Sequence, residues 1–400
     1  MNMTRQRMFG LAIGASAVLA LAAPANGQSY DQASLEDLEK ATAVAADWAE
    51  GKVDFNAPKV TYTGPAITMR TSLHTPASAY SSKVWKSQFD ALERMSGGKI
   101  KPDHRWGMTV HHVSKGFEAN RDNLTDVSPC WSFYKSNSFP MMQALFLPGI
   151  SPNAAVHAIM AEKMYPKYFR EEYERQGVYM GRIRATTPYI YFNKKAITSL
   201  EDLKGLKVRS GGGIQADVQA ALGAVPTSMS SAEFYTAFQR GIIDSVSLSD
   251  SATETFKINE IATHRTYVNL SRVILEMCFN KTWVDALPPD LRALLDHWAR
   301  GASQFDTQIN FILGGGISRK IFHEQGMAFD ELSAAEDKRW HDAVQPVIDQ
   351  YLEAMAAKGL PAKELLADMR KVVAEYENKT PNEIMMETIK NPIKGILPGT

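Results

Sequence analysis

The sequence predicts an α/β protein that is long enough for two domains. Its 400 residues allow a large buried core, and 44% hydrophobic with 22% charged residues is typical of a folded globular protein. From Ala66 onward, short apolar runs of strand length alternate with segments in which apolar residues recur every three or four positions. This alternation favours parallel sheets covered by helices on both faces.

The N-terminus has the pattern of a cleavable signal peptide. Arg5 and Arg7 precede an apolar run from Phe9 to Ala23, and small residues follow up to Gly27. The run is too short to span a bilayer comfortably, which favours secretion over an anchor helix, the alternative. We therefore expect residues 1–27 to be removed, with cleavage near Gly27, and the mature protein to be soluble outside the cytoplasm.

Residues 28–64 are predicted to form an N-terminal extension. Apolar residues at helical spacing predict one helix from Asp31 to Ala49, and Pro58 and Gly64-Pro65 interrupt any regular pattern after it. Further along, strands are expected at Ile67–Leu73, Leu124–Phe133, Val178–Ala185, Tyr189–Asn193, Leu206–Arg209, Asp244–Ser249 and Arg272–Phe279. The main helices are expected at Tyr80–Met95, Asn153–Gln176, Ile214–Leu222, Ser230–Arg240, from Pro288-Pro289 onward, and after Ala334.

Composition and motifs argue against several function classes. Lys plus Arg and Asp plus Glu both number 44, which is unlike a nucleic-acid-binding protein. No nucleotide-binding, zinc-protease or serine-hydrolase motif is present, and the only histidine pair, His111-His112, has poor spacing for one metal ion. We expect no cofactor and no metal. An enzyme whose active site is assembled from scattered residues stays open as an alternative.

The two cysteines, Cys130 and Cys278, are interpreted as separate buried residues. In an oxidising compartment they can pair, but the sequence contains no evidence that they lie close together.

One segment has the features of an anion-binding site. Lys207-Val208-Arg209 ends a predicted strand, Ser210 to Gly213 form a glycine-rich loop, and a helix begins near Ile214. Unpaired N–H groups at such a helix start can bind an anion, and an arginine beside them can bind a carboxylate through two parallel hydrogen bonds. The alternative is that Arg209 pairs with an acidic residue of the protein.

The same region resembles a known family. Residues 196–209 (AITSLEDLKGLKVR), 221–226 (ALGAVP) and 233–244 (EFYTAFQRGIID) are similar, in order, to three elements of the solute-binding proteins of TRAP (tripartite ATP-independent periplasmic) transporters. Weaker similarity extends from about residue 66 to 375.

The resemblance implies a periplasmic binding protein fold. In this fold, two α/β domains are joined by crossing hinge strands and a long connecting helix, and they close on a ligand in the cleft between them. We expect domain I to comprise 65–186 plus 276–316, domain II to comprise 187–275 plus 317–358, and a C-terminal helical segment to follow at 359–400.

The resemblance also implies ligand-binding residues. Arg209 matches the family arginine that holds the ligand carboxylate, and Arg184, in the stretch Arg-Ala-Thr-Thr, matches a second; the alternative for Arg184 is a hinge-strand residue that faces solvent. The order of segments places four further residues at the cleft, although each can instead be a core or rim residue. These are His74 and Trp131 from domain I, and Ser249 and Asp250 from domain II.

Some positions depart from the family pattern. Trp131 stands where an acidic residue is frequent, and Leu248 stands where sialic-acid-type members have Asn. A sialic acid ligand is therefore not expected. Trp131 with the nearby Phe133 and Tyr134 permits a flatter or more apolar acid, but all three can also be ordinary strand aromatics.

The implied function is transport. The chain is expected to capture a small organic carboxylate in the periplasm and deliver it to integral membrane permease subunits. Two alternatives stay open: a ligand-sensing partner of a membrane receptor, and a periplasmic enzyme.

Overall fold

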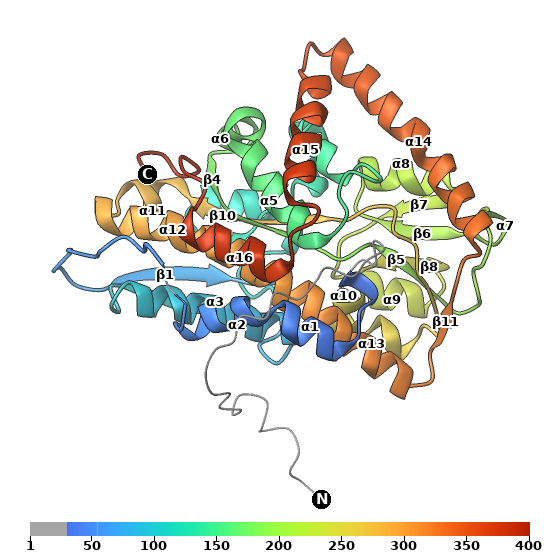
Figure 1. Ribbon diagram of the computed structural model, residues 1–400, viewed down its shortest axis with the longest axis horizontal. Helices are drawn as coiled ribbons and strands as arrows, with labels where there is room; N and C mark the ends of the chain where they lie inside the picture. The colour runs from blue at the N-terminus through green and yellow to red at the C-terminus, as the bar shows by residue number, and fades with distance from the viewer. Residues whose placement is uncertain (1–29, 54) are drawn as a thin grey trace, which may run out of the picture.

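The computed structural model describes residues 30–53 and 55–400, so the predicted signal peptide, 1–27, lies outside the described residues. The described residues form a mixed α/β structure built on two sheets (Figure 1). The first sheet has the order β2-β1-β3-β10-β4 and comprises β1 (Ile67–Ser72), β2 (Ile100–Arg105), β3 (Val127–Pro129), β4 (Val178–Ala185) and β10 (Ile274–Asn280). The second has the order β11-β9-β5-β8-β6-β7 and comprises β5 (Ile190–Asn193), β6 (Lys207–Ser210), β7 (Val225–Ser228), β8 (Ser245–Leu248), β9 (His264–Thr266) and β11 (Ala328–Asp330).

Both sheets contain the expected parallel pairs together with antiparallel ones. Strand β1 is parallel to β2 and β3, and β6 is parallel to β7 and β8. However, β10 runs antiparallel to β3 and β4, and β5 runs antiparallel to β8 and β9. The antiparallel strands are those entered when the chain crosses from one sheet to the other, so they lack the helical crossover that makes neighbours parallel.

Two crossing segments lie side by side between the sheets. The chain leaves β4 for β5 through residues 186–189 and returns from β9 to β10 through residues 267–273. The N–H of Thr186 donates to the carbonyl oxygen of Val273 over 2.9 Å, and the N–H of Tyr189 donates to that of Ser271 over 3.0 Å. The predicted crossing strands are thus confirmed.

A long helical segment makes the third connection. Helix α12 (Pro289–Asp306) continues through the π-helical turn η7 (Thr307–Leu313) into α13 (Gly314–Glu324). A π-helical turn inserts an extra residue into a helix and re-aims the side chains around it. Here the turn begins directly after the buried residue Asp306. The fold class predicted from the sequence, including the long connecting helix, is confirmed.

The remaining helices cover the two sheets and mostly match the predicted ranges. They are α1 (Leu35–Ala41), α2 (Ala43–Glu50), α3 (Tyr80–Met95), α4 (Gly116–Arg121), α5 (Ala154–Met164), α6 (Arg170–Glu174), α7 (Leu200–Leu203), α8 (Ile214–Ala221), α9 (Phe234–Gln239), α10 (Asp250–Thr255), α11 (Lys281–Asp285), α14 (Ala334–Ala357), α15 (Ala362–Tyr376) and α16 (Pro381–Lys390). Helix α14 lies beside α8, α15 returns to pack on α5, and α16 packs along α12 (Figure 1). None of the helices in the described part of the chain has the length and apolar character needed to cross a membrane.

Two predicted elements differ from the structure. The single helix expected at Asp31–Ala49 is divided at Thr42, whose hydroxyl donates to the carbonyl oxygen of Leu38 over 2.8 Å. The strand expected at Leu124–Phe133 is reduced to β3, because Ser132 turns the chain by donating its N–H and hydroxyl to the buried carboxyl of Glu276.

The N-terminal extension packs against the rest of the chain. Trp48 is buried on Gly301 of α12, where a Cβ would lie 2.8 Å from the indole ring, so only glycine permits this contact. The buried pair of Asp31 and Arg272, 2.6 Å apart, ties the start of the extension to the second crossing segment.

The interpretation of the two cysteines as separate is wrong. Cys130, directly after β3, and Cys278 of β10 form a disulfide with their Cα atoms 5.7 Å apart. The antiparallel register of β3 and β10 places them side by side although 148 positions separate them in the sequence. A cross-link that closes so long a loop stabilises the fold by about 2–5 kcal/mol.

Candidate functional site

A cavity of about 40 Å³ lies where the carboxyl ends of β1 and β3 face those of β6 and β8. Carboxyl ends of strands in open α/β sheets are the usual place for a ligand. Ring-bearing residues form a large part of the lining: His74, Trp131, Phe133, Tyr189, Phe234, Phe256 and Phe311. The polar and charged lining residues are Thr75, Ser81, Arg184, Arg209, Ser231, Ser251, Thr255 and Asn310.

Arg209 is a buried cation without an acidic partner among residues 30–53 and 55–400. It lies on β6 with 2% of its surface exposed, and its guanidinium carbon is 3.9 Å from the centre of the Phe234 ring. Burial lowers the pKa of Arg209, while electrostatic interactions with Tyr189 and Tyr134 oppose that change. Its Nε atom has no hydrogen-bond partner in the described structure. Since an uncompensated buried charge is costly, this position favours an anion.

Arg184 lines the same cavity but is already paired. Its guanidinium donates to Asp306 over 2.8 Å, and Arg182 contacts the other carboxylate oxygen of Asp306 over 2.7 Å. Burial alone raises the pKa of Asp306, but the two arginines outweigh burial and hold that pKa below its usual value. Asn310, on the π-helical turn, also donates to Asp306 over 3.1 Å. The turn thus brings Asp306 and Asn310 together to orient Arg184 towards the cavity.

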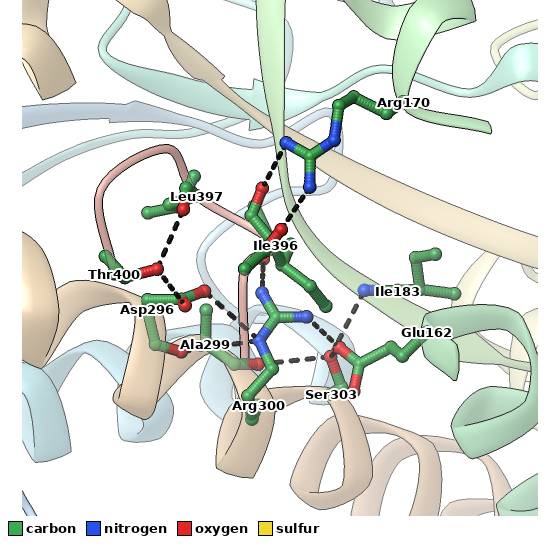
Figure 2. Close-up of polar contacts among 12 residues, drawn as sticks. Glu162, Arg170, Ile183, Asp296, Ala299, Arg300, Ser303, Ile396, Leu397 and Thr400 are labelled. Carbon is green, nitrogen blue, oxygen red and sulfur yellow. Dashed lines mark hydrogen bonds and ion pairs between the residues drawn. The ribbon is translucent and has the colours of Figure 1, made fainter. Parts of the chain in front are cut away.

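A second buried ionic group lies behind Arg182. Figure 2 shows Arg300 between Glu162 and Asp296, with Ser303 donating to Glu162 over 2.5 Å. Burial raises the pKa of Glu162 to about 7, against the opposing effect of Arg300. Glu162 also favours the charged form of Arg182 electrostatically. Arg182 therefore does not depend on Asp306 alone for negative charge, although it shares that carboxylate with Arg184.

His74, from the end of β1, contributes a neutral imidazole ring. The ring meets Trp131 edge to face with centres 4.9 Å apart and stacks on Phe256 at 6.0 Å. Burial lowers the pKa of His74 to about 3, and the charge of Arg184 lowers it further. Its Nδ1 atom is buried and has no hydrogen-bond partner within the described residues.

Four of the six residues predicted to bind a ligand line the cavity, and two do not. Arg209, Arg184, Trp131 and His74 line the cavity. Ser249 and Asp250 lie just beyond it, where Ser249 precedes α10 and Asp250 begins that helix. Both oxygens of Asp250 are engaged by Arg265, at 2.7 and 2.8 Å, and one also contacts Arg319 at 3.3 Å. Asp250 thus supports the fold around α10.

The glycine-rich loop before α8 does not direct free N–H groups at the cavity, as the sequence had predicted. The N–H of Gly211 donates to the Gln215 side chain, that of Gly212 to Ser210, and that of Ile214 to Gln143. The loop instead gives room for the side chains of Phe133 and Gln143. A Cβ on Gly211 would lie 2.7 Å from the Phe133 ring, and one on Gly213 would lie 2.3 Å from the Gln143 side chain.

Several lining residues were not predicted as ligand contacts. Phe234 lies inside the 233–244 motif and Tyr189 begins a predicted strand. The sequence therefore pointed to both segments, but neither residue was predicted to contact a ligand. Phe256, Asn310 and Phe311 had none, because they follow helices α10 and α12 at positions fixed only by packing. Within the described residues, no three His, Cys, Asp or Glu side chains gather into a metal site.

Comparison with known proteins identifies the family. Residues 77–354 match the model of bacterial extracellular solute-binding protein family 7. The chain belongs to this family. Among curated relatives of this family 7 chain is the C4-dicarboxylate-binding periplasmic protein DctP of Rhodobacter capsulatus, 30% identical over 168 residues, which are 42% of this chain and 50% of that protein. The match spans about half the length of the first curated relatives.

Solved structures share the fold of this family 7 protein. A TRAP solute-binding protein from Rhodoferax ferrireducens, in complex with copurified benzoate, has a TM-score of 0.74 and 20% identity, covering 78% of this chain and 99% of that chain. Another, from Bordetella bronchiseptica with bound (R)- and (S)-mandelate, has a TM-score of 0.70 and 23% identity, covering 77% and 99%.

Proposed function

We propose that this family 7 protein is a periplasmic TRAP-type receptor that captures a small organic carboxylate and delivers it to membrane permease subunits. It binds its ligand without changing it chemically. The halves that close on the ligand are 65–186 plus 276–316 and 187–275 plus 317–358. Arg209, Arg184, Trp131 and His74 contact the ligand.

The observation that carries this proposal is the state of Arg209. Its guanidinium is buried in a cavity whose other arginine, Arg184, already has Asp306 as a partner. A ligand carboxylate supplies the missing negative charge and accepts the charge-assisted hydrogen bonds of Arg209. The named ligands of the similar structures, benzoate and mandelate, are carboxylates as well.

Closure follows from where the lining residues lie. His74 and Trp131 follow strands of the first sheet, whereas Arg209 and Phe234 lie on or beside strands of the second. A ligand that touches both groups binds the closed arrangement more strongly than the open one and so shifts the population towards closure. A permease that recognises the closed form then receives only loaded receptor.

A thermal-shift panel tests the proposal. Purified mature protein is heated with monocarboxylates, dicarboxylates, sugar acids and aromatic acids, each beside its neutral amide. At about a hundred times its dissociation constant, an acid adds about 2.7 kcal/mol to the free energy of unfolding and raises the Tm visibly. We expect at least one acid to do so and its amide to fail. Equal stabilisation by acid and amide would contradict carboxylate capture.

A further inference from the structure

We propose that the ligand is a small aromatic monocarboxylate with a hydroxyl group on its ring, held by Arg209 at the carboxylate and by His74 at the hydroxyl. This inference rests on the proposed function and names the substrate class of the same site. Four observations carry it: the arrangement of the rings, the single uncompensated charge, an unpartnered polar atom, and the size of the cavity.

The rings that line the cavity contact one another in a continuous series that begins at Arg209. Arg209 lies over Phe234, whose ring meets that of Phe256 edge to face at 5.3 Å. Phe256 stacks on His74, and His74 meets Trp131. Trp131 also contacts Tyr134, which lies outside the lining, with ring centres 5.9 Å apart, and Tyr134 interacts electrostatically with Arg209. Such rings favour a flat aromatic partner over an aliphatic chain or a hydroxyl-rich sugar.

The charges of the cavity suit one negative charge on the ligand. Arg184 is neutralised by Asp306, and Arg182, which shares that carboxylate, is also in the field of Glu162. Arg209 alone lacks an acid within the described residues. A second ligand carboxylate would be buried among rings without a free cation, which is costly.

The Nδ1 atom of His74 supplies the contact for a ring hydroxyl. It is buried without a partner in the described part of the chain, and its ring lies between Trp131 and Phe256. Buried polar atoms in folded proteins nearly always have a hydrogen-bond partner, so the unpartnered atoms of the lining, His74 Nδ1 and the hydroxyls of Ser231 and Ser251, mark places for polar ligand groups. A hydroxyl can donate to or accept from this nitrogen, whichever tautomer is present.

The size of the cavity limits the ligand to small and flat molecules. Its volume of about 40 Å³ is room for about three water molecules when one needs about 10–15 Å³ of such space. A single substituted ring is larger than this space, so it enters only when the two halves separate further, and a flat ring requires the smallest separation. A hexuronic acid, which is bulkier and not flat, would require a larger cavity.

Calorimetric titration of the mature protein with matched probes tests the inference. The probes are benzoate, 3-hydroxybenzoate, 4-hydroxybenzoate, cyclohexanecarboxylate, isophthalate and succinate, each titrated into the wild type, His74→Phe and Arg209→Gln. His112→Phe, at an exposed histidine outside the cavity lining, is the matched control. The phenyl ring keeps the stacking on Trp131 and Phe256 and removes only the ring nitrogens.

We expect one hydroxybenzoate to bind about tenfold more tightly than benzoate, the effect of one good buried hydrogen bond. Benzoate in turn should bind more tightly than cyclohexanecarboxylate. In His74→Phe the preference for the hydroxyl should disappear, while benzoate binding stays within about threefold of the wild type; His112→Phe should behave as the wild type.

Two kinds of failure are distinguishable. If succinate or isophthalate binds most tightly and loses its affinity in Arg209→Gln, carboxylate capture stands and the aromatic monocarboxylate is wrong. If no acid of any class binds, or if all bind equally in Arg209→Gln, the proposed function itself fails. Should His74→Phe not fold, the order of affinities in the wild type alone still decides between ring classes.

Discussion

The guanidinium carbon of Arg209 lies 3.9 Å from the centre of the Phe234 ring, so the buried cation rests directly on an aromatic face. Phe234 begins α9 and is itself buried, which fixes the ring. Tyr189 and Tyr134 interact electrostatically with the same guanidinium. These three neighbours hold the arginine in place without using a carboxylate, so its charge stays available to a ligand.

Replacing the ring beneath Arg209 should therefore weaken acid binding. In Phe234→Leu the apolar contact is largely kept and the cation–π attraction is lost, which is about 1–2 kcal/mol for a desolvated pair. We expect acid affinity to fall about fivefold to thirtyfold. Titration calorimetry measures it, with Phe329→Leu, a partly buried ring outside the cavity, as control. Unchanged affinity in Phe234→Leu would show that the stacking does not position Arg209.

Closure should depend on Gly211. A Cβ there would lie 2.7 Å from the Phe133 ring and 3.0 Å from Oε1 of Gln215, and Gly211 is not among the positive-φ glycines, so the clash with Phe133 is the main strain that alanine introduces. Overpacking of this kind costs about 1–3 kcal/mol. We expect Gly211→Ala to bind its acid more weakly and to have a larger radius of gyration by small-angle scattering.

The double variant Gly211→Ala/Phe133→Leu serves as the control for this prediction, because a smaller side chain at 133 relieves the clash. It should recover a compact shape. A Gly211→Ala single variant that binds acid as the wild type does would mean that Phe133 adjusts freely and that the loop does not limit closure.

Asp306 should be essential for stability as well as for the site. Asp306→Asn leaves Arg182 and Arg184 buried without their shared anion. Removing one partner from a buried ion pair costs about 3–5 kcal/mol, and urea unfolding should show a loss of that order. Asp90→Asn is the control, because Asp90 pairs with Lys86 on an exposed helix surface and such pairs contribute under about 1 kcal/mol. Similar stability of both variants would contradict the role given to Asp306.

Because His157 is buried in its neutral form, the free energy of unfolding should decrease as the pH falls. Burial lowers the pKa of His157 to about 3, below its ordinary value of 6.5. Between these values the unfolded chain binds a proton and the folded chain does not, so lowering the pH favours unfolding with a slope of up to about 1.4 kcal/mol per pH unit. We expect urea unfolding between pH 6.5 and 4 to show a weaker pH dependence for His157→Gln than for the wild type.

The exposed His323 supplies the comparison for this effect. His323→Gln, which replaces an exposed rather than a buried histidine, should keep the wild-type pH dependence. If both glutamine variants follow the wild-type curve, burial of His157 does not contribute to acid sensitivity.

The local elements around Arg209 could be predicted closely from the sequence. The strand expected at Leu206–Arg209 is β6, Lys207–Ser210, and the helix expected at Ile214–Leu222 is α8, Ile214–Ala221. The apolar spacing marks the strand and the helix, and the glycine-rich loop between them marks where the strand ends and the helix begins. The place of Arg209 near the end of a strand, just before a loop and a helix, could therefore be predicted from the sequence alone.

The partners of these residues could not be predicted, because they come from distant segments. The N–H of Ile214 donates to Gln143, 71 positions away, and Arg184 of β4 pairs with Asp306 of α12, 122 positions away. The disulfide joins residues 148 positions apart through strand pairing. Each contact depends on tertiary packing, and the sequence pattern describes only local periodicity.

The most direct test of carboxylate capture is the affinity of the best acid from the panel for Arg209→Gln, measured by titration calorimetry. Arg240→Gln, at an exposed arginine at the end of α9, is the matched control. Loss of one partner of a buried charge pair costs about 2–5 kcal/mol, so Arg209→Gln should bind at least about thirtyfold more weakly while Arg240→Gln binds as the wild type. An acid that binds Arg209→Gln as tightly as the wild type would contradict the account.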